Sequence, residues 1–99
     1  MTGPSVETDW EALFGIAAGH TLTPARHRRL SRVDRVRDTR WFDEHDAQSR
    51  LVACYRSWFE RSLRAPFGGE LGWERFSPDG RLLDREVRRS TPASVRALH

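Results

Sequence analysis

The sequence contains a single cysteine, Cys54, and no lysine at all. A lone cysteine excludes an intrachain disulfide and a multi-cysteine zinc site. No apolar run approaches the ~20 residues that a membrane-spanning helix needs, and the first residues have neither the basic nor the apolar region of a signal peptide. We therefore expect a protein of the reducing cytoplasm that has no membrane partner.

The motifs of catalysis are also missing. The serines do not stand in a Gly-x-Ser-x-Gly setting, and Gly68-Gly69 lacks the Lys-Ser/Thr that completes a phosphate-binding loop. His45 lies among Asp43, Glu44 and Asp46, but consecutive side chains in a turn point apart, and no second histidine stands at ligand spacing. We therefore expect no catalytic residue, no metal ion and no cofactor, and we predict that the protein is not an enzyme.

Because lysine is absent, all seventeen cationic side chains are arginine, and they face fourteen acidic ones for a net charge of +3. Selection for phosphate binding would favour arginine without eliminating lysine, which also binds phosphate well. The codon usage of a GC-rich genome explains the missing lysine better. The basic balance alone therefore does not predict a nucleic-acid surface.

What the chain does have is enough apolar and aromatic side chains for one small core. It is 99 residues long, which predicts a single domain over residues 1–99. Five Phe, four Trp and one Tyr distinguish it from a disordered chain. We expect flexible tails over residues 1–7 and 89–99, a helical region over 8–33 and a β-meander over 34–88.

The helical region carries two start signals. Thr8-Asp9-Trp10-Glu11 reads as a capping box, and an apolar stripe follows at helical spacing, which predicts a helix over residues 9–18. The stripe consists of Trp10, Leu13, Phe14 and Ala17. Thr23-Pro24 then predicts a second, short helical turn over residues 25–31.

From about residue 34 the pattern favours strands. We predict four of them, near residues 35–42, 50–59, 71–76 and 81–87. Ser77-Pro78-Asp79-Gly80 is the clearest turn, since proline suits its second position and Asp-Gly its last two. The predicted fold class is α+β, with the N-terminal helix and the second helical turn packed on a four-stranded antiparallel β-meander.

The two predicted hairpins resemble one another. Trp41 precedes Arg50 by nine residues and Trp73 precedes Arg81 by eight, and both arginines are followed by aliphatic side chains. Each unit thus consists of an aromatic strand, an acidic turn and an Arg-Leu strand. The resemblance predicts two similar hairpins with a difference of one residue in length.

Alternation along residues 51–59 separates two faces of the sheet. Leu51, Ala53, Tyr55 and Phe59 share one face, which we assign to the core beneath the helix. Val52, Cys54, Arg56 and Trp58 share the other face.

Trp and Arg are the residue types that anchor protein interfaces. We therefore expect an exposed protein-binding surface, with Trp73 and Arg75 as cross-strand neighbours of the outward pair. The candidate protein-binding residues are Arg56, Trp58, Trp73 and Arg75. The predicted function is a non-enzymatic binding module, such as an inhibitor, adaptor or regulator of a larger macromolecular partner, of the kind that phages and mobile elements encode.

An alternative function is nucleic-acid binding. Seven arginines between residues 26 and 40 are interrupted only by Asp34 and Asp38, a local excess of positive charge that suits a phosphate backbone. These candidate residues are Arg26, Arg28, Arg29, Arg32, Arg35, Arg37 and Arg40. No recognition helix or RNA-binding motif accompanies them, and nothing in the sequence predicts an oligomeric state.

Overall fold

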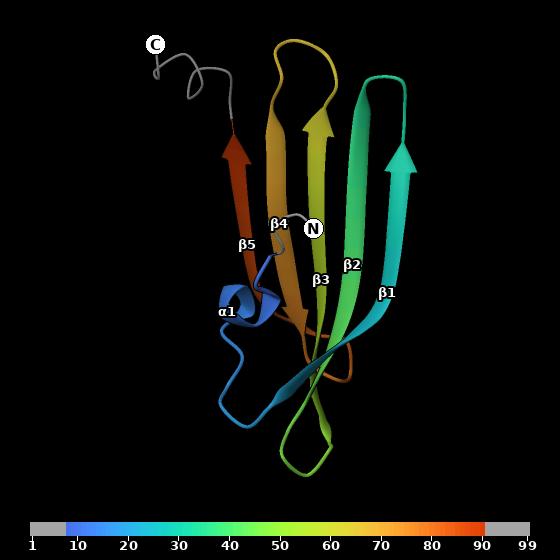
Figure 1. Ribbon diagram of the computed structural model, residues 1–99. Coiled ribbons are helices and arrows are strands. Elements are labelled where there is room, and N and C mark those ends of the chain that lie inside the picture. Colours follow the sequence, from blue (N-terminus) through green and yellow to red (C-terminus); the bar gives the residue numbers. More distant parts are fainter. Residues whose placement is uncertain (1–7, 91–99) are drawn as a thin grey trace, which may run out of the picture.

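A computed structural model describes residues 8–90 as one short helix and a five-stranded antiparallel sheet (Figure 1). The strands follow one another in the sheet in the order of the sequence, so every connection is a hairpin. The elements are α1 (Trp10–Phe14), β1 (Thr21–Ser31), β2 (Arg35–His45), β3 (Leu51–Ser62), β4 (Gly69–Phe76) and β5 (Leu82–Ser90). The expected tails lie outside the described residues, except that Arg89 and Ser90 belong to β5.

The prediction of an α+β fold with four strands is wrong, because the chain is mostly β and has five strands. Residues 25–31, expected as a helical turn, lie in β1, which pairs with β2 from Thr21 opposite His45 to Ser31 opposite Val36. β2 offers a free row of backbone hydrogen-bonding groups, and this pairing overrides the weak local helix signal. Pro24 is tolerated because β1 is an edge strand with a bulge at this point.

The helix is also much shorter than predicted. Asp9, not Thr8, is the N-cap, and its carboxylate accepts a hydrogen bond from the backbone N–H of Ala12 at 3.2 Å. Gly15 ends α1 in the left-handed conformation with φ of 70°, and its N–H donates to the carbonyl of Ala12. Within the described part of the chain, no helix is long and apolar enough to cross a membrane.

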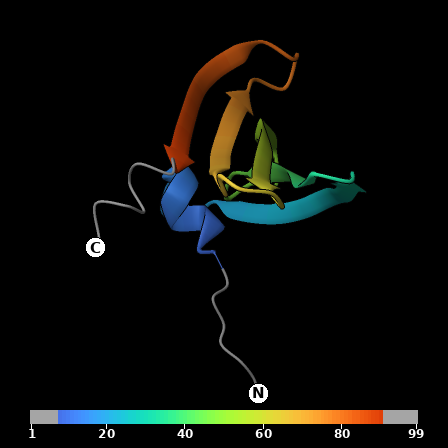
Figure 2. The ribbon, with the colours of Figure 1, turned by 90° about the horizontal axis from the view of Figure 1, so that it is seen from above.

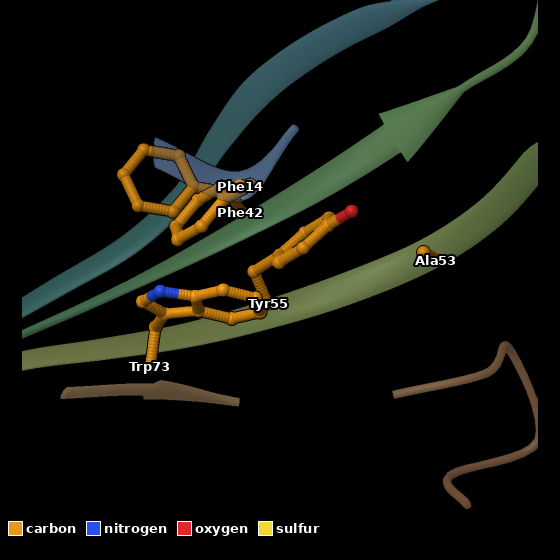
Figure 3. Close-up of a cluster of buried hydrophobic side chains, with 5 residues drawn as sticks. All are labelled: Phe14, Phe42, Ala53, Tyr55 and Trp73. Carbon is orange, nitrogen blue, oxygen red and sulfur yellow. The ribbon is translucent and has the colours of Figure 1, made fainter. Parts of the chain in front are cut away.

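One aromatic cluster joins α1 to the sheet (Figure 3). The ring of Phe14 stacks on Tyr55 with 4.3 Å between centroids, and it meets the edges of Phe42 and Trp73 at 5.5 and 5.4 Å. Trp10 lies 5.1 Å from Phe42 and closes one side of the cluster. Figure 2 shows that the sheet is curved and that α1 lies on the inner side of the curve. We call this the helix-side face and the opposite one the outer face.

The turns of the two predicted hairpins have the same hydrogen bonds. In residues 46–50, the N–H of the first residue donates to the carbonyl of the fifth at 2.9 Å, and the N–H of the fourth donates to the carbonyl of the first at 3.0 Å. In residues 77–81 both distances are 2.8 Å. The fourth residue has a positive φ in each turn, 64° at Ser49 and 92° at Gly80.

Alignment of the two turns by these hydrogen bonds changes which residues of the two hairpins correspond. Arg50 and Arg81 occupy equivalent positions, and the residue eight positions earlier is Phe42 in one hairpin and Trp73 in the other. The spacing from the aromatic residue to the arginine is therefore the same in both hairpins, and Phe42, not Trp41, is the counterpart of Trp73. Both counterparts are buried on the helix-side face, with exposed fractions of 5% and 7%.

The equivalence of the turns predicts opposite effects of exchanging their fourth residues. Ser49→Gly should raise the free energy of unfolding by about 1 kcal/mol, because glycine adopts positive φ without the Cβ clash, and Gly80→Ser should lower it by a similar amount. Urea denaturation measures both changes. Ala47→Gly is the matched control and should not stabilise the protein, because a glycine where φ is negative only adds freedom to the unfolded chain. Changes of the same sign at Ser49 and Gly80 would contradict the shared geometry.

Candidate functional site

The four residues expected to form one protein-binding surface are divided between the two faces of the sheet. Arg56 and Trp58 lie on the outer face, as the alternation along β3 predicts. Trp73 is paired with Ser57 and therefore points to the helix side, and Arg75 follows it on the same side. The quartet is not brought together.

Trp58 is buried, contrary to the expectation of an exposed ring. Only 3% of it is accessible, although it lies on the face that α1 does not cover. The guanidinium groups of Arg37 and Arg56 lie 5.4 and 5.2 Å from its ring centroid, and its indole N–H donates to Glu70 at 2.8 Å. The ring lies across Gly72, which is opposite Trp58 on β4. These contacts leave little of Trp58 for a partner.

The carboxylates of the outer face hold its arginines in a network of ion pairs. Glu60 and Glu74 each contact two arginines, and the indole of Trp58 and the guanidinium of Arg89 hold the pKa of Glu70 below its usual value. The pairs are Arg35–Glu60 at 3.2 Å, Arg37–Glu60 at 3.3 Å, Arg56–Glu74 at 2.6 Å, Arg85–Glu74 at 3.6 Å and Arg89–Glu70 at 3.0 Å. Most of the cationic charge here is thus already partnered within the protein.

The seven arginines proposed for nucleic-acid binding are likewise distributed over several sites. Arg26, Arg28, Arg35 and Arg37 lie on the outer face, Arg29 and Arg40 on the helix-side face, and Arg32 between β1 and β2. Arg35 and Arg37 pair with Glu60, and Arg26 lies over the ring of Trp41 at 4.8 Å. Among the described residues, no carboxylate lies within ion-pair distance of Arg28, Arg29, Arg32 or Arg40.

The acidic residues around His45 point in different directions. Glu44 is 3% exposed on the helix-side face, where it accepts hydrogen bonds from the hydroxyl of Tyr55 at 2.8 Å and from Nδ1 of His20 at 2.6 Å. Burial, and then the bond to Glu44, raises the pKa of Tyr55 well above its usual value. Asp46 instead caps its own turn by accepting from the backbone N–H groups of residues 48 and 50. Within residues 8–90, no three His, Cys, Asp or Glu side chains gather as metal ligands would.

Cys54 lies half-buried on the outer face. Burial raises the pKa of its thiol, and the neighbouring carboxylate of Asp43 raises it further. At neutral pH the thiol is therefore held in its protonated, unreactive form.

Sequence reasoning missed an apolar pair on the helix-side face, exposed Phe59 and half-buried Leu71. Phe59 and Leu71 are direct cross-strand neighbours, flanked by Asp38 on β2 and Arg88 on β5. The sequence predicts Phe59 in the core beneath the helix, but it is 47% exposed, because α1 is only five residues long and covers the rows around Phe14.

A groove of about 700 Å³ lies above this pair. Trp10 lines the groove on the side of α1, Arg40 and Asp38 line it on the side of β2, and buried Ser57 contributes to its floor. Arg61 follows Phe59 on the same face of β3 and is exposed. We define the open face as Arg40, Phe59, Arg61 and Leu71.

The contact between Trp58 and Gly72 can be tested by mutation. A Cβ at residue 72 would lie 2.6 Å from Cε2 of Trp58, so Gly72→Ala should lower the free energy of unfolding by about 1–3 kcal/mol. In a Trp58→Leu background the ring is absent and most of this penalty should disappear. Urea denaturation of the four proteins in this cycle measures the coupling. An equal penalty in both backgrounds would show that the ring does not lie over Gly72.

In comparisons with known proteins, the chain matches no protein family, no curated protein and no solved structure at a significant level.

Proposed function

We propose that this protein is a non-enzymatic binding module that docks an acidic, partly apolar segment of another protein onto the open face. The observation that carries the proposal is the Phe59–Leu71 pair, two neighbouring apolar side chains that line a groove on the helix-side face. Single exposed apolar residues are common on protein surfaces, but an adjacent pair in a concave site is typical of a contact surface.

The shape of the site supports a peptide segment as the ligand. Binding hot spots are concave sites in which large side chains lose their contact with water. Trp10 forms one wall of the groove and Phe59 is 47% exposed in it, so an inserted apolar side chain would contact both rings. A segment that inserts one or two apolar side chains here would remove the remaining exposed surface of Phe59 from water.

The charges around the groove favour an acidic segment. Arg29, Arg40 and Arg61 are exposed on the helix-side face, and no carboxylate of the described residues lies within ion-pair distance of them. Asp38, the nearest acidic residue, is already bound to His27 at 2.9 Å. Acidic groups beside the apolar anchor would meet these arginines and would speed and orient the encounter.

The outer face is a weaker candidate for the same role. Its carboxylates already pair with arginines, and guanidinium groups lie over the rings of its two tryptophans, Trp41 and Trp58. A partner would have to break these contacts before it gained new ones. The open face requires no such rearrangement.

Nucleic-acid binding is a second candidate, and the observation in its favour is the edge strand β1. Arg28 and Arg29 on this strand and Arg32 just beyond it are exposed and have no carboxylate partner among the described residues. Their side chains point to different sides of the strand, so a phosphate backbone would contact them along the edge of the sheet and not on one face.

An affinity capture from extracts of the source cells tests the proposal. The immobilised wild-type protein should retain a specific protein, and Phe59→Ser with Arg40→Glu should weaken that binding about tenfold or more, because the apolar anchor and one charge are lost together. Calorimetric titration of the captured protein against the wild type and this double variant measures the change. Circular dichroism should show that the double variant is folded, since the two side chains are exposed.

Leu82→Ser with Leu83→Ser is the matched control, because these two side chains are 53% and 50% exposed at the other end of the sheet. The control should bind as tightly as the wild type. Retention that nuclease abolishes, and that Arg28→Ala with Arg32→Ala weakens, would assign the function to nucleic-acid binding instead. Capture that is the same for the wild type and the open-face variant would contradict the proposed surface.

A further inference from the structure

Two loops project side by side from the end of the sheet opposite the turns 46–50 and 77–81 (Figure 1). They connect β1 to β2 and β3 to β4, and they are tied together by a hydrogen bond from the N–H of Leu63 to the carbonyl of Asp34 at 2.8 Å. We define the tip as Arg32, Val33, Leu63, Arg64 and Phe67.

Two apolar side chains of the tip, Val33 and Phe67, are the most exposed large hydrophobic side chains of the described residues, and Leu63 is exposed as well. Val33 is 82% exposed, Phe67 63% and Leu63 42%. They belong to two loops that the hydrogen bond between Leu63 and Asp34 holds together, so all three lie at the same end of the sheet. The free protein gains nothing from exposing such side chains to water.

The charge of the tip is positive. Arg32 and Arg64 are both exposed, and no carboxylate of the described residues lies within ion-pair distance of either. Asp34, the acidic residue within the first loop, lies 3.8 Å from Arg35 and is already compensated. The tip therefore combines protruding apolar side chains with free guanidinium groups beside them.

We propose that the tip docks onto the surface of an anionic lipid bilayer. Valine, leucine and phenylalanine at the end of projecting loops can enter the interfacial layer, while flanking arginines contact lipid phosphates. The open face is a groove suited to an inserted peptide, whereas the tip is a projection, which suits insertion into a lipid layer. That no helix of residues 8–90 could cross a membrane does not bear on this contact. The proposal revises the expectation of no membrane partner for the bilayer surface alone.

The test uses the full chain and vesicles of defined composition, measured by cosedimentation. The wild type should bind vesicles made of equal parts phosphatidylcholine and phosphatidylglycerol, and it should bind pure phosphatidylcholine vesicles far more weakly. Val33→Ser with Phe67→Ser leaves the charge unchanged and should weaken binding about tenfold or more. Arg32→Gln with Arg64→Gln should weaken it roughly fivefold for each arginine at low salt.

Leu82→Ser with Leu83→Ser removes comparably exposed apolar side chains at the opposite end and should bind as the wild type does. The exposure of Val33 and Phe67 keeps their replacement from disturbing the fold, which circular dichroism checks. Wild-type protein that stays in solution with the anionic vesicles overturns the proposal. Unchanged vesicle binding by Val33→Ser with Phe67→Ser also overturns it. The positive net charge of the chain would then be enough to hold it on the anionic vesicles without any inserted side chain.

Discussion

Phe14 is the only buried residue of α1, and the core of the helix-side face forms around its ring. Its stacking on Tyr55 and its edge contacts with Phe42 and Trp73 join the helix to three neighbouring strands. Because α1 has only five residues, it shields from water only the rows of the sheet beside Phe14. The limit of the helix therefore determines where the helix-side face becomes open, and Phe59 and Leu71 lie just beyond it.

The outer face has no covering element among the described residues and depends on arginine instead. A guanidinium group can cover an aromatic ring with its flat face and its aliphatic stem while its charge stays in water or in an ion pair. Arg37 and Arg56 cover Trp58 in this way, and Glu60 and Glu74 hold them in position. The arginine-rich composition thus has a structural role here, which reduces the part of it that remains for binding a partner.

Local pattern in the sequence was sufficient for part of this architecture. The turn at residues 77–80 and the alternation that buries Ala53 and Tyr55 follow from residue type and spacing alone. The face on which Trp73 lies could also have been predicted, because alignment of the two turns makes Trp73 the counterpart of Phe42. Taking Trp73 as a cross-strand neighbour of the outward pair Arg56 and Trp58 predicts the wrong face, because Trp73 lies opposite Ser57.

The remaining features depend on contacts between distant residues. β1 is a strand because β2 offers it a partner, although its own residues include Pro24 and have almost no buried side chain. Trp58 is buried because Gly72 lies opposite it and two arginines cover it. The exposure of Phe59 follows from the end of α1 at Phe14, one turn earlier than the apolar stripe predicts.

The central claim is that Trp58 is enclosed while its neighbour in sequence, Phe59, faces water. Hydroxyl-radical footprinting with mass spectrometry tests this directly, because the two residues can be compared within one peptide. An indole reacts faster than a phenyl ring when both are accessible, so the order of reaction reports their burial. The structure predicts that Phe59 is oxidised readily in the folded protein and that Trp58 is protected until urea unfolds the chain. Rapid oxidation of Trp58 with protection of Phe59 would contradict the account.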